Sequence, residues 1–306
     1  MAEEFRRQVR RLPDRPLVAM LIFAGLFASC LFCAPSLASS DLAPAKLRSN
    51  TIAAFNHYVQ LTNQRNETEL KRGSDLLWID SLSAPQRAEA YSALKGGEVK
   101  IQQLHTLDDG KSIECPEGII HHWVGVVFIP GANLNDVLSV LEDYNRQSFY
   151  YAPDVELSKI ESRDGDHFRV FLRFRRHKVI TVVLDTEHDI RYFHDAPGRA
   201  HSRSSAVRIA EVENPGKSDE RELPPGEDGG YLWRMETWWR MEEGDGGVYV
   251  QSEVVSLTRD IPTGLGWLVG PFVTSIPKET LGFTLEATKK AVESKAKKSP
   301  EAQKGF

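Results

Sequence analysis

The sequence predicts an α+β fold in which a curved antiparallel sheet wraps around a long C-terminal helix. Three observations support this prediction. Residues 41–97 carry apolar side chains at helical spacing, the hydrophobic period changes to two from residue 98, and a helical pattern returns at residues 277–298. Consecutive strands with short turns form a meander, and a meander with helices on one side is an α+β arrangement.

Residues 1–38 have the pattern of an export signal. Five arginines lie within residues 1–16, an uncharged and mostly apolar run follows at 17–34, and Ser36-Leu-Ala38 supplies small residues for cleavage. We therefore expect an exported bacterial protein, periplasmic or secreted, from which this signal peptide is removed. The alternative is a retained anchor that contacts the membrane through residues 17–34, since this run is at the short end of a membrane span.

The mature part of the chain is acidic. The whole chain has 38 Lys and Arg and 43 Asp and Glu, and residues 1–38 hold 5 and 3 of these, which leaves a formal charge of −7. An acidic protein without a basic stripe is a poor binder of nucleic acid, so no nucleic-acid partner is expected. Only Cys115 remains after removal of the signal, which excludes an intramolecular disulfide.

Residues 39–97 form a predicted helical prefix that packs on the domain after it. Apolar residues at helical spacing support a first helix: Leu47, Ile52, Phe55, Val59 and Thr62. The polar run Asn63–Thr68 indicates a break. A second helix is predicted between an N-cap at Ser83 and the glycines Gly96 and Gly97.

The main domain is predicted at residues 98–298, and a disordered tail at 299–306. Strands are predicted at 98–104, 119–129, 167–175, 179–184, 190–195, 204–213, 231–242 and 248–259. A helix capped by Asn133 interrupts them, and a proline-rich and glycine-rich segment at 213–230 is a long loop. The apolar segment 261–276 is predicted to be a loop at the rim of a cavity, and the last helix to begin at Pro277.

This order of elements resembles the START-like helix-grip superfamily, also called SRPBCC, which includes polyketide cyclase/dehydrase-like and lipid-transfer proteins. The points of similarity are Tyr144 to Val155 after the first helix of the domain, the Asp164-Gly165 hairpin, the strand leading into Leu257–Pro262, and the closing helix. The resemblance covers residues 98–298. It implies about seven strands gripping the last helix, with an apolar cavity between them. The prefix and the 213–230 loop depart from the family pattern.

The mature chain has no recognised motif for a nucleophile, a phosphate loop or a metal, so neither a cofactor nor a metal is predicted. Of the pair His121-His122, at most one side chain can face a cavity, since neighbours on a strand point to opposite faces. The acidic residues and histidines between 185 and 195 lack ligand spacing, and we interpret them as the solvated end of a hairpin. Cys115 is interpreted as a free structural thiol.

A ligand in the cavity would contact aromatic and apolar residues of the strands and the last helix. The candidates are Trp123, Phe168, Val170, Trp233, Met235, Trp239, Glu253, Trp267 and Leu281. The same apolar stripes are also consistent with a filled core. If Glu253 points inward it is a buried carboxylate that needs a partner, with Arg234 and Arg259 as candidates; if it points outward it is solvated.

These observations favour an exported carrier that binds a hydrophobic or amphipathic small molecule, such as a lipid or a polyketide-like compound. The first alternative is a cyclase/dehydrase-type enzyme, in which Glu253 or His122 in the cavity performs acid–base chemistry. The second is an accessory protein with a collapsed cavity, whose helical prefix docks a partner. Fold alone does not decide among them, because this superfamily has diverse functions.

Overall fold

The computed structural model describes residues 45–177, 181–260 and 266–302, except for the side chains of residues 266–274 and 296–302. The predicted signal peptide and membrane anchor lie outside these residues. Among the described helices, none combines the length and the apolar character needed to cross a membrane.

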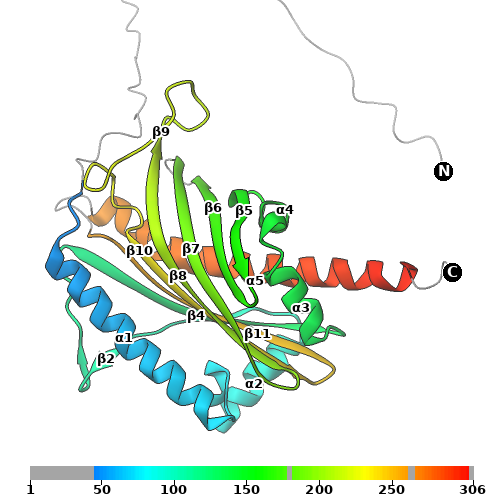
Figure 1. Cartoon of the computed structure of the whole chain (residues 1–306). Coiled ribbons are helices and arrows are strands. Elements are labelled where there is room, and N and C mark those ends of the chain that lie inside the picture. The colour runs from blue at the N-terminus through cyan, green and yellow to red at the C-terminus, as the bar shows by residue number, and fades with distance from the viewer. Residues whose placement is uncertain (1–44, 178–180, 261–265, 303–306) are drawn as a thin grey trace, which may run out of the picture. The chain divides into compact units, whose positions relative to one another are not determined.

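Two helices and a short 3-10 turn form the N-terminal prefix (Figure 1). They are α1 (Ser49–Arg72), η1 (Trp78–Ser81) and α2 (Ala84–Lys95). The predicted break at Asn63–Thr68 is wrong, because α1 continues through it and ends at Gly73, whose φ of 68° is the left-handed conformation that glycine favours. Asn63, Arg65 and Asn66 of that run meet polar or charged side chains of the sheet, so the run is compatible with a packed helix.

The large sheet has eight strands in the order β1-β4-β11-β10-β8-β7-β6-β5, and a short β9 pairs with β8. Every pairing is antiparallel. The strands are β1 (Lys100–Gln103), β4 (Gly118–Pro130), β5 (Val155–Asp164), β6 (His167–His177), β7 (Thr181–Ala196), β8 (Arg199–Glu213), β9 (Arg221–Glu222), β10 (Arg234–Gly244) and β11 (Gly247–Arg259). A separate hairpin joins β2 (Leu107–Asp108) and β3 (Lys111–Ser112).

The predicted hairpin end between 185 and 195 is wrong, because β7 is one continuous strand through this region. Asp185 is buried there, and Arg173 of β6 donates two hydrogen bonds to its carboxylate at 2.7 and 2.8 Å. The polar residues that resemble a turn in the sequence are thus paired across the sheet, and the run 185–190 contains no Gly or Pro that would end a strand.

Two helical regions lie beside the sheet. The helix α3 (Leu134–Leu141) begins after the predicted cap, whose Asn133 side chain accepts a hydrogen bond from the Asp136 N–H at 3.0 Å. The short helices η2 (Tyr144–Arg146) and α4 (Gln147–Tyr150) follow it. The last helix α5 (Gly266–Ala302) begins well before Pro277, so most of the predicted rim loop is helical, and it includes the first residues of the predicted tail.

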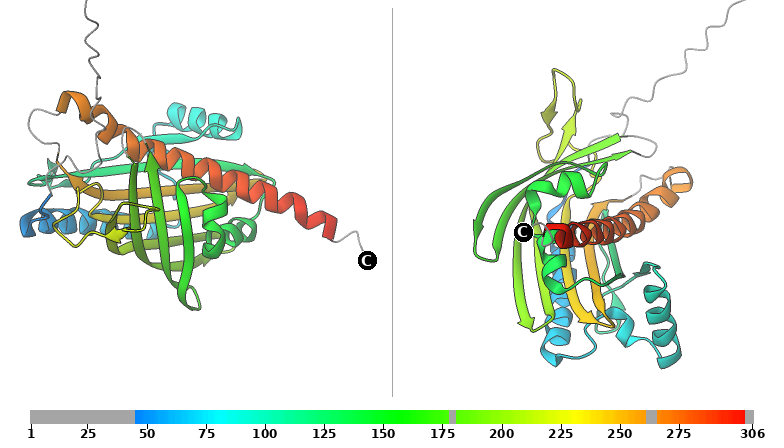
Figure 2. Two further views of the ribbon diagram at one scale, coloured as in Figure 1. Left: turned by 90° about the horizontal axis from the view of Figure 1, so that it is seen from above. Right: turned by 90° about the vertical axis from the view of Figure 1, so that its right-hand side faces the viewer.

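The sheet curves around α5, which confirms the predicted helix-grip arrangement (Figure 2). We call the sheet face toward α5 the inner face and the opposite face, covered by α1 and α2, the outer face. Figure 1 shows α1 in front of the strands and α5 behind them. In β4 and β11 the alternating residues are apolar on both faces, with Val127 and Val250 in the inner core and Phe128 and Tyr249 in the outer core. The prefix thus belongs to the same compact unit, Ser39–Phe306.

Candidate functional site

One end of the inner face is closed by core packing. The hairpin end of β10 and β11, the facing part of β4, and helices α3 and α5 contribute fully buried side chains there: Val127, Ile129, Val137, Met241, Val248, Val250, Leu285 and Val292. Gly125 marks where α5 crosses the sheet, because a Cβ atom at this position would lie 2.6 Å from Leu285 Cδ1 and 3.3 Å from Leu281 Cδ2. This end therefore leaves no room for a ligand.

Three of the predicted ligand contacts are buried in the inner core. Phe168 and Val170 of β6 are completely buried, and Leu281 of α5 packs against the same cluster. The alternation in β6 correctly assigned these side chains to the inner face. It did not reveal that aromatic residues from η2 and β7, Tyr144 and Tyr192, would pack against Phe168.

The other end of the inner face, near the start of α5, is less closed. Side chains on this face remain only partly buried: Trp123, Met235, Thr237, Trp239 and Val254. They come from β4, β10 and β11, three adjacent strands, and Phe283 of α5 is partly buried beside them. Three of the predicted ligand contacts therefore lie together at this open end. Trp267, another predicted contact, lies in the first part of α5, where the structure describes only the backbone.

The open end also carries polar groups that periodicity did not identify. His188 is 2% exposed, its Nε2 lies 2.9 Å from the Thr186 hydroxyl, and its Nδ1 lies 3.4 Å from the Ser204 hydroxyl. His121 lies 3.0 Å from the Thr258 hydroxyl. Burial lowers the pKa of each histidine to about 4, so both imidazoles are neutral at pH 7. The Trp123 Nε1 and Ser202 Oγ atoms are buried without a hydrogen-bond partner among the described residues.

Glu253 and His122 lie on the outer face, beneath α1, so their prediction as cavity residues is wrong. In β11 the side chain of Glu253 shares its face with Tyr249 and Leu257, which pack against the helical prefix. Its carboxylate accepts a hydrogen bond from His122 Nε2 at 2.8 Å and forms an ion pair with Arg65 of α1. The prediction of Arg234 or Arg259 as the partner is therefore wrong as well.

The hydrogen bonds around His122 define its protonation. An ionised carboxylate can only accept, so Nε2 carries the proton and Nδ1 accepts from the Tyr58 hydroxyl at 2.9 Å. The same hydroxyl accepts from the Thr106 N–H at 2.7 Å. Burial lowers the pKa of His122. Burial alone would raise the pKa of Glu253, but the His122 hydrogen bond and the positive charges of Arg65 and Arg240 lower it. Glu253 is thus ionised beside a neutral imidazole.

Residues of α1 complete this outer network, and sequence reasoning missed them. Arg240 of β10 is buried, and it donates to the Leu76 carbonyl, to Asn66 Oδ1 and to Glu69 at 2.7 Å. Asn66 lies within the polar run Asn63–Thr68 that was interpreted as a break, and Glu69 follows it directly. Trp233 also lies on the outer face, in contact with the α1 cluster, because it precedes β10 and is out of phase with the strand.

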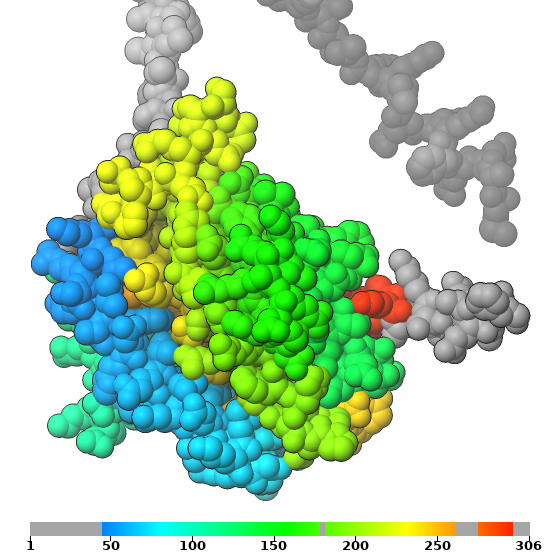
Figure 3. All heavy atoms as spheres, in the orientation of Figure 1, coloured from blue at the N-terminus to red at the C-terminus, as the bar shows by residue number. Residues whose placement is uncertain are grey.

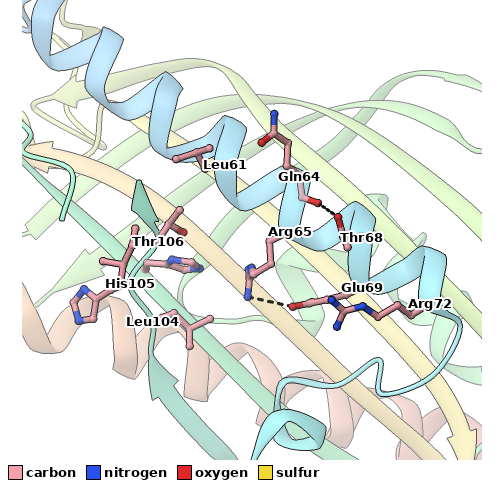
Figure 4. Close-up of a pocket in the computed structure, with 11 residues that line it drawn as sticks. Leu61, Gln64, Arg65, Thr68, Glu69, Arg72, Leu104, His105 and Thr106 are labelled. Carbon is pink, nitrogen blue, oxygen red and sulfur yellow. Dashed lines mark hydrogen bonds and ion pairs between the residues drawn. The ribbon is translucent and has the colours of Figure 1, made fainter. Parts of the chain in front are cut away.

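A pocket of about 580 Å³ opens beside this network, between α1 and the segment from Leu104 to Leu107 (Figure 4). His122 is at its wall, and Leu61, Gln64, Arg65, Thr68, Glu69 and Arg72 of α1 line it. The space-filling view shows α1 covering the strands on this side of the molecule (Figure 3). Nowhere in the described part of the chain do three His, Cys, Asp or Glu side chains gather in a way that could hold a metal ion.

Comparison with solved structures finds similar chains at low sequence identity. The similar structures are START-like proteins. A STAR-related lipid transfer protein from Xanthomonas axonopodis is 19% identical and aligns over 63% of this chain and 98% of its own, with a TM-score of 0.40. Human STARD10 is 10% identical over 74% and 86%, with a TM-score of 0.44. The Zhui aromatase/cyclase from Streptomyces is 14% identical over 58% and 96%, with a TM-score of 0.38.

At these identities and scores the likeness concerns the arrangement of the chain and carries no inference about ligand or activity. No family model and no curated protein matches the sequence.

Proposed function

We propose that this protein is an exported carrier that binds an amphipathic, lipid-like or polyketide-like small molecule between the sheet and α5. The observation that supports the proposal most directly is the contrast between the two ends of the inner face. One end is fully packed, whereas Trp123, Met235, Trp239 and Val254 at the other end stay partly exposed. Ligand sites are typically lined by apolar and aromatic groups with a few polar ones.

The polar groups at the open end favour an amphipathic ligand over a purely apolar one. The Trp123 indole N–H and the Ser202 hydroxyl are buried and have no hydrogen-bond partner among the residues that the structure describes, whereas buried polar groups normally have one. A ligand with an oxygen acceptor would satisfy the indole. The enzyme alternative is weakened, because Glu253 and His122 lie on the opposite face and His121 and His188, with pKa values of about 4, are weak bases at neutral pH.

Native mass spectrometry of the full chain, purified from the exported fraction of an expressing cell, tests the proposal. We expect the protein to carry a small molecule that solvent extraction releases. We also expect its mass to be that of a chain starting at Ser39. The substitution Val254→Trp fills the open end and is expected to abolish the bound mass. The control Val207→Trp, at an exposed position of β8, is expected to keep it.

Two results would contradict the carrier proposal. If the folded wild-type protein carries no small molecule and binds no fluorescent fatty acid, the inner face is a collapsed core, as in the accessory-protein alternative. If Val254→Trp keeps the bound molecule while its circular dichroism spectrum matches that of the wild type, the ligand is bound elsewhere. Retention of residues 1–38 in the purified protein would contradict the cleavage.

A further inference from the structure

The pocket on the outer face is separate from the proposed carrier site. It lies on the α1 side of the sheet, whereas the carrier site faces α5. In Figure 4 the Arg65, Glu69 and Arg72 side chains extend from α1 toward the segment that holds Leu104 and Thr106. Its volume of about 580 Å³ falls within the roughly 300–1,000 Å³ of typical small-molecule sites.

Charge around the pocket favours an anion. The guanidinium groups of Arg65 and Arg72 line the pocket together with the carboxylate of Glu69, and the buried Arg240 and Glu253 form ion pairs with Glu69 and Arg65. Both carboxylates are already paired with Arg65 or Arg240, and the side chain of Arg65 remains 37% exposed. Arg72 is exposed at the pocket, and within the described part of the chain it has no ion pair. Its guanidinium is available to an incoming anion.

The opposite part of the pocket is apolar. Leu61 of α1 and Leu104 and Leu107 after β1 line it, and Leu107 is 49% exposed. Thr68 and Thr106 also line the pocket. The pocket thus combines a cationic side and an apolar side within reach of one small molecule.

We propose that this outer pocket binds a small amphipathic organic anion, a carboxylate or a phosphate monoester. Its charged group is held by Arg72 and Arg65, and its apolar body lies against Leu61, Leu104 and Leu107. The planar guanidinium forms two parallel hydrogen bonds with such groups, which gives geometric specificity as well as charge. The His122–Glu253 pair behind Arg65 fixes the position of that arginine, so the cationic side is preorganised.

A simpler explanation for Arg72 is that it complements the dipole at the C-terminal end of α1. Lys71 is the neighbouring cation in the same last turn, is also exposed, and does not line the pocket. The dipole explanation applies to both residues, whereas anion binding applies to Arg72 alone. The substitution Lys71→Gln is therefore the matched control for Arg72→Gln.

The test is calorimetric titration of the full chain with sodium octanoate, octyl phosphate, inorganic phosphate and octanol. We expect octanoate or octyl phosphate to bind, and inorganic phosphate and octanol to bind at least tenfold more weakly. Arg72→Gln should weaken binding of the octyl anion about tenfold, as expected for loss of one charged hydrogen-bonding group. Arg72→Lys should have an intermediate effect, and Lys71→Gln should change affinity less than about twofold.

Failure of this inference is distinct from failure of the carrier proposal. Val254→Trp, which fills the inner face, should leave the part of octanoate binding that depends on Arg72 unchanged. If Val254→Trp abolishes octanoate binding and Arg72→Gln does not, the anion binds between the sheet and α5, and the outer site is refuted while the carrier proposal stands. Equal binding of octanol, equal weakening by Lys71→Gln, or no binding of either octyl anion at millimolar concentration would also refute the outer site.

Discussion

The buried histidines of the inner face predict that the protein loses stability in mild acid. Burial lowers the pKa of His188 to about 4 from the ordinary 6.5, and hydroxyl groups rather than carboxylates lie at its two ring nitrogens. The folded protein therefore holds this imidazole neutral. In the unfolded chain the same residue becomes protonated as the pH falls through 6.5, because it is solvated there.

The sign and size of the effect follow from this difference. Between pH 6.5 and about 4 the unfolded chain binds a proton at His188 that the folded chain does not, so the free energy of unfolding falls as the pH falls. One pKa unit corresponds to about 1.4 kcal/mol, so His188 should remove about 3 kcal/mol across this window. Above pH 6.5 the residue is neutral in both states and contributes no pH dependence.

Urea unfolding of the full chain, measured at intervals from about pH 7 to pH 4.5, tests this reasoning against the non-titrating variant His188→Gln. The variant should be less stable at pH 7, yet its free energy of unfolding should fall about 2–3 kcal/mol less than that of the wild type. The exposed-site control His105→Gln should follow the wild-type curve. Parallel pH dependence of His188→Gln and the wild type would show that folding does not suppress protonation of His188.

Two further substitutions test the packing on each face by urea unfolding. Glu253→Gln removes a buried carboxylate and should lower the free energy of unfolding by about 2 kcal/mol. This is below the roughly 3–5 kcal/mol of a fully buried pair, because the Arg65 side chain is 37% exposed. A loss no greater than that of the exposed control Glu67→Gln would contradict the outer network. Leu285→Ala leaves a cavity in the closed end and should lower the free energy of unfolding by about 2–5 kcal/mol. The neighbouring exposed control Glu286→Ala should lower it by less than about 0.5 kcal/mol. Equal losses in the two variants would contradict the packing of α5.

The features that the sequence predicts well are those set by local periodicity. The alternation of Phe168 and Val170 places them on one face of β6, and Leu281 and Leu285 lie on the buried stripe of α5. Asn133 caps α3 because an asparagine side chain can accept from the third residue of a helix. In each case the deciding interaction lies within one element, so the residues around it carry the signal.

The predicted break at Asn63–Thr68 shows where local reasoning fails. Consecutive polar residues are typical of a loop, because a helix face made of them has nothing apolar to bury. In the structure Asn66 meets Arg240 of β10, and Arg65 meets Glu253 of β11, partners 174 and 188 residues away in sequence. These side chains pack against polar and charged groups that only the folded sheet brings into place. No pattern within the run itself distinguishes this helix from a loop.

The same reasoning explains why the face of Glu253 could not be assigned from the sequence. Residues on both sides of β11 are buried, because α5 covers one face and the helical prefix covers the other. Period-two alternation locates a core only when one face is solvated. In a strand covered on both faces, side chains that point to either face are buried. The burial of a carboxylate therefore does not reveal the face on which it lies. The prefix supplies the partner that this side requires: Arg65 of α1 pairs with Glu253 on the outer face, where α1 also lines a pocket.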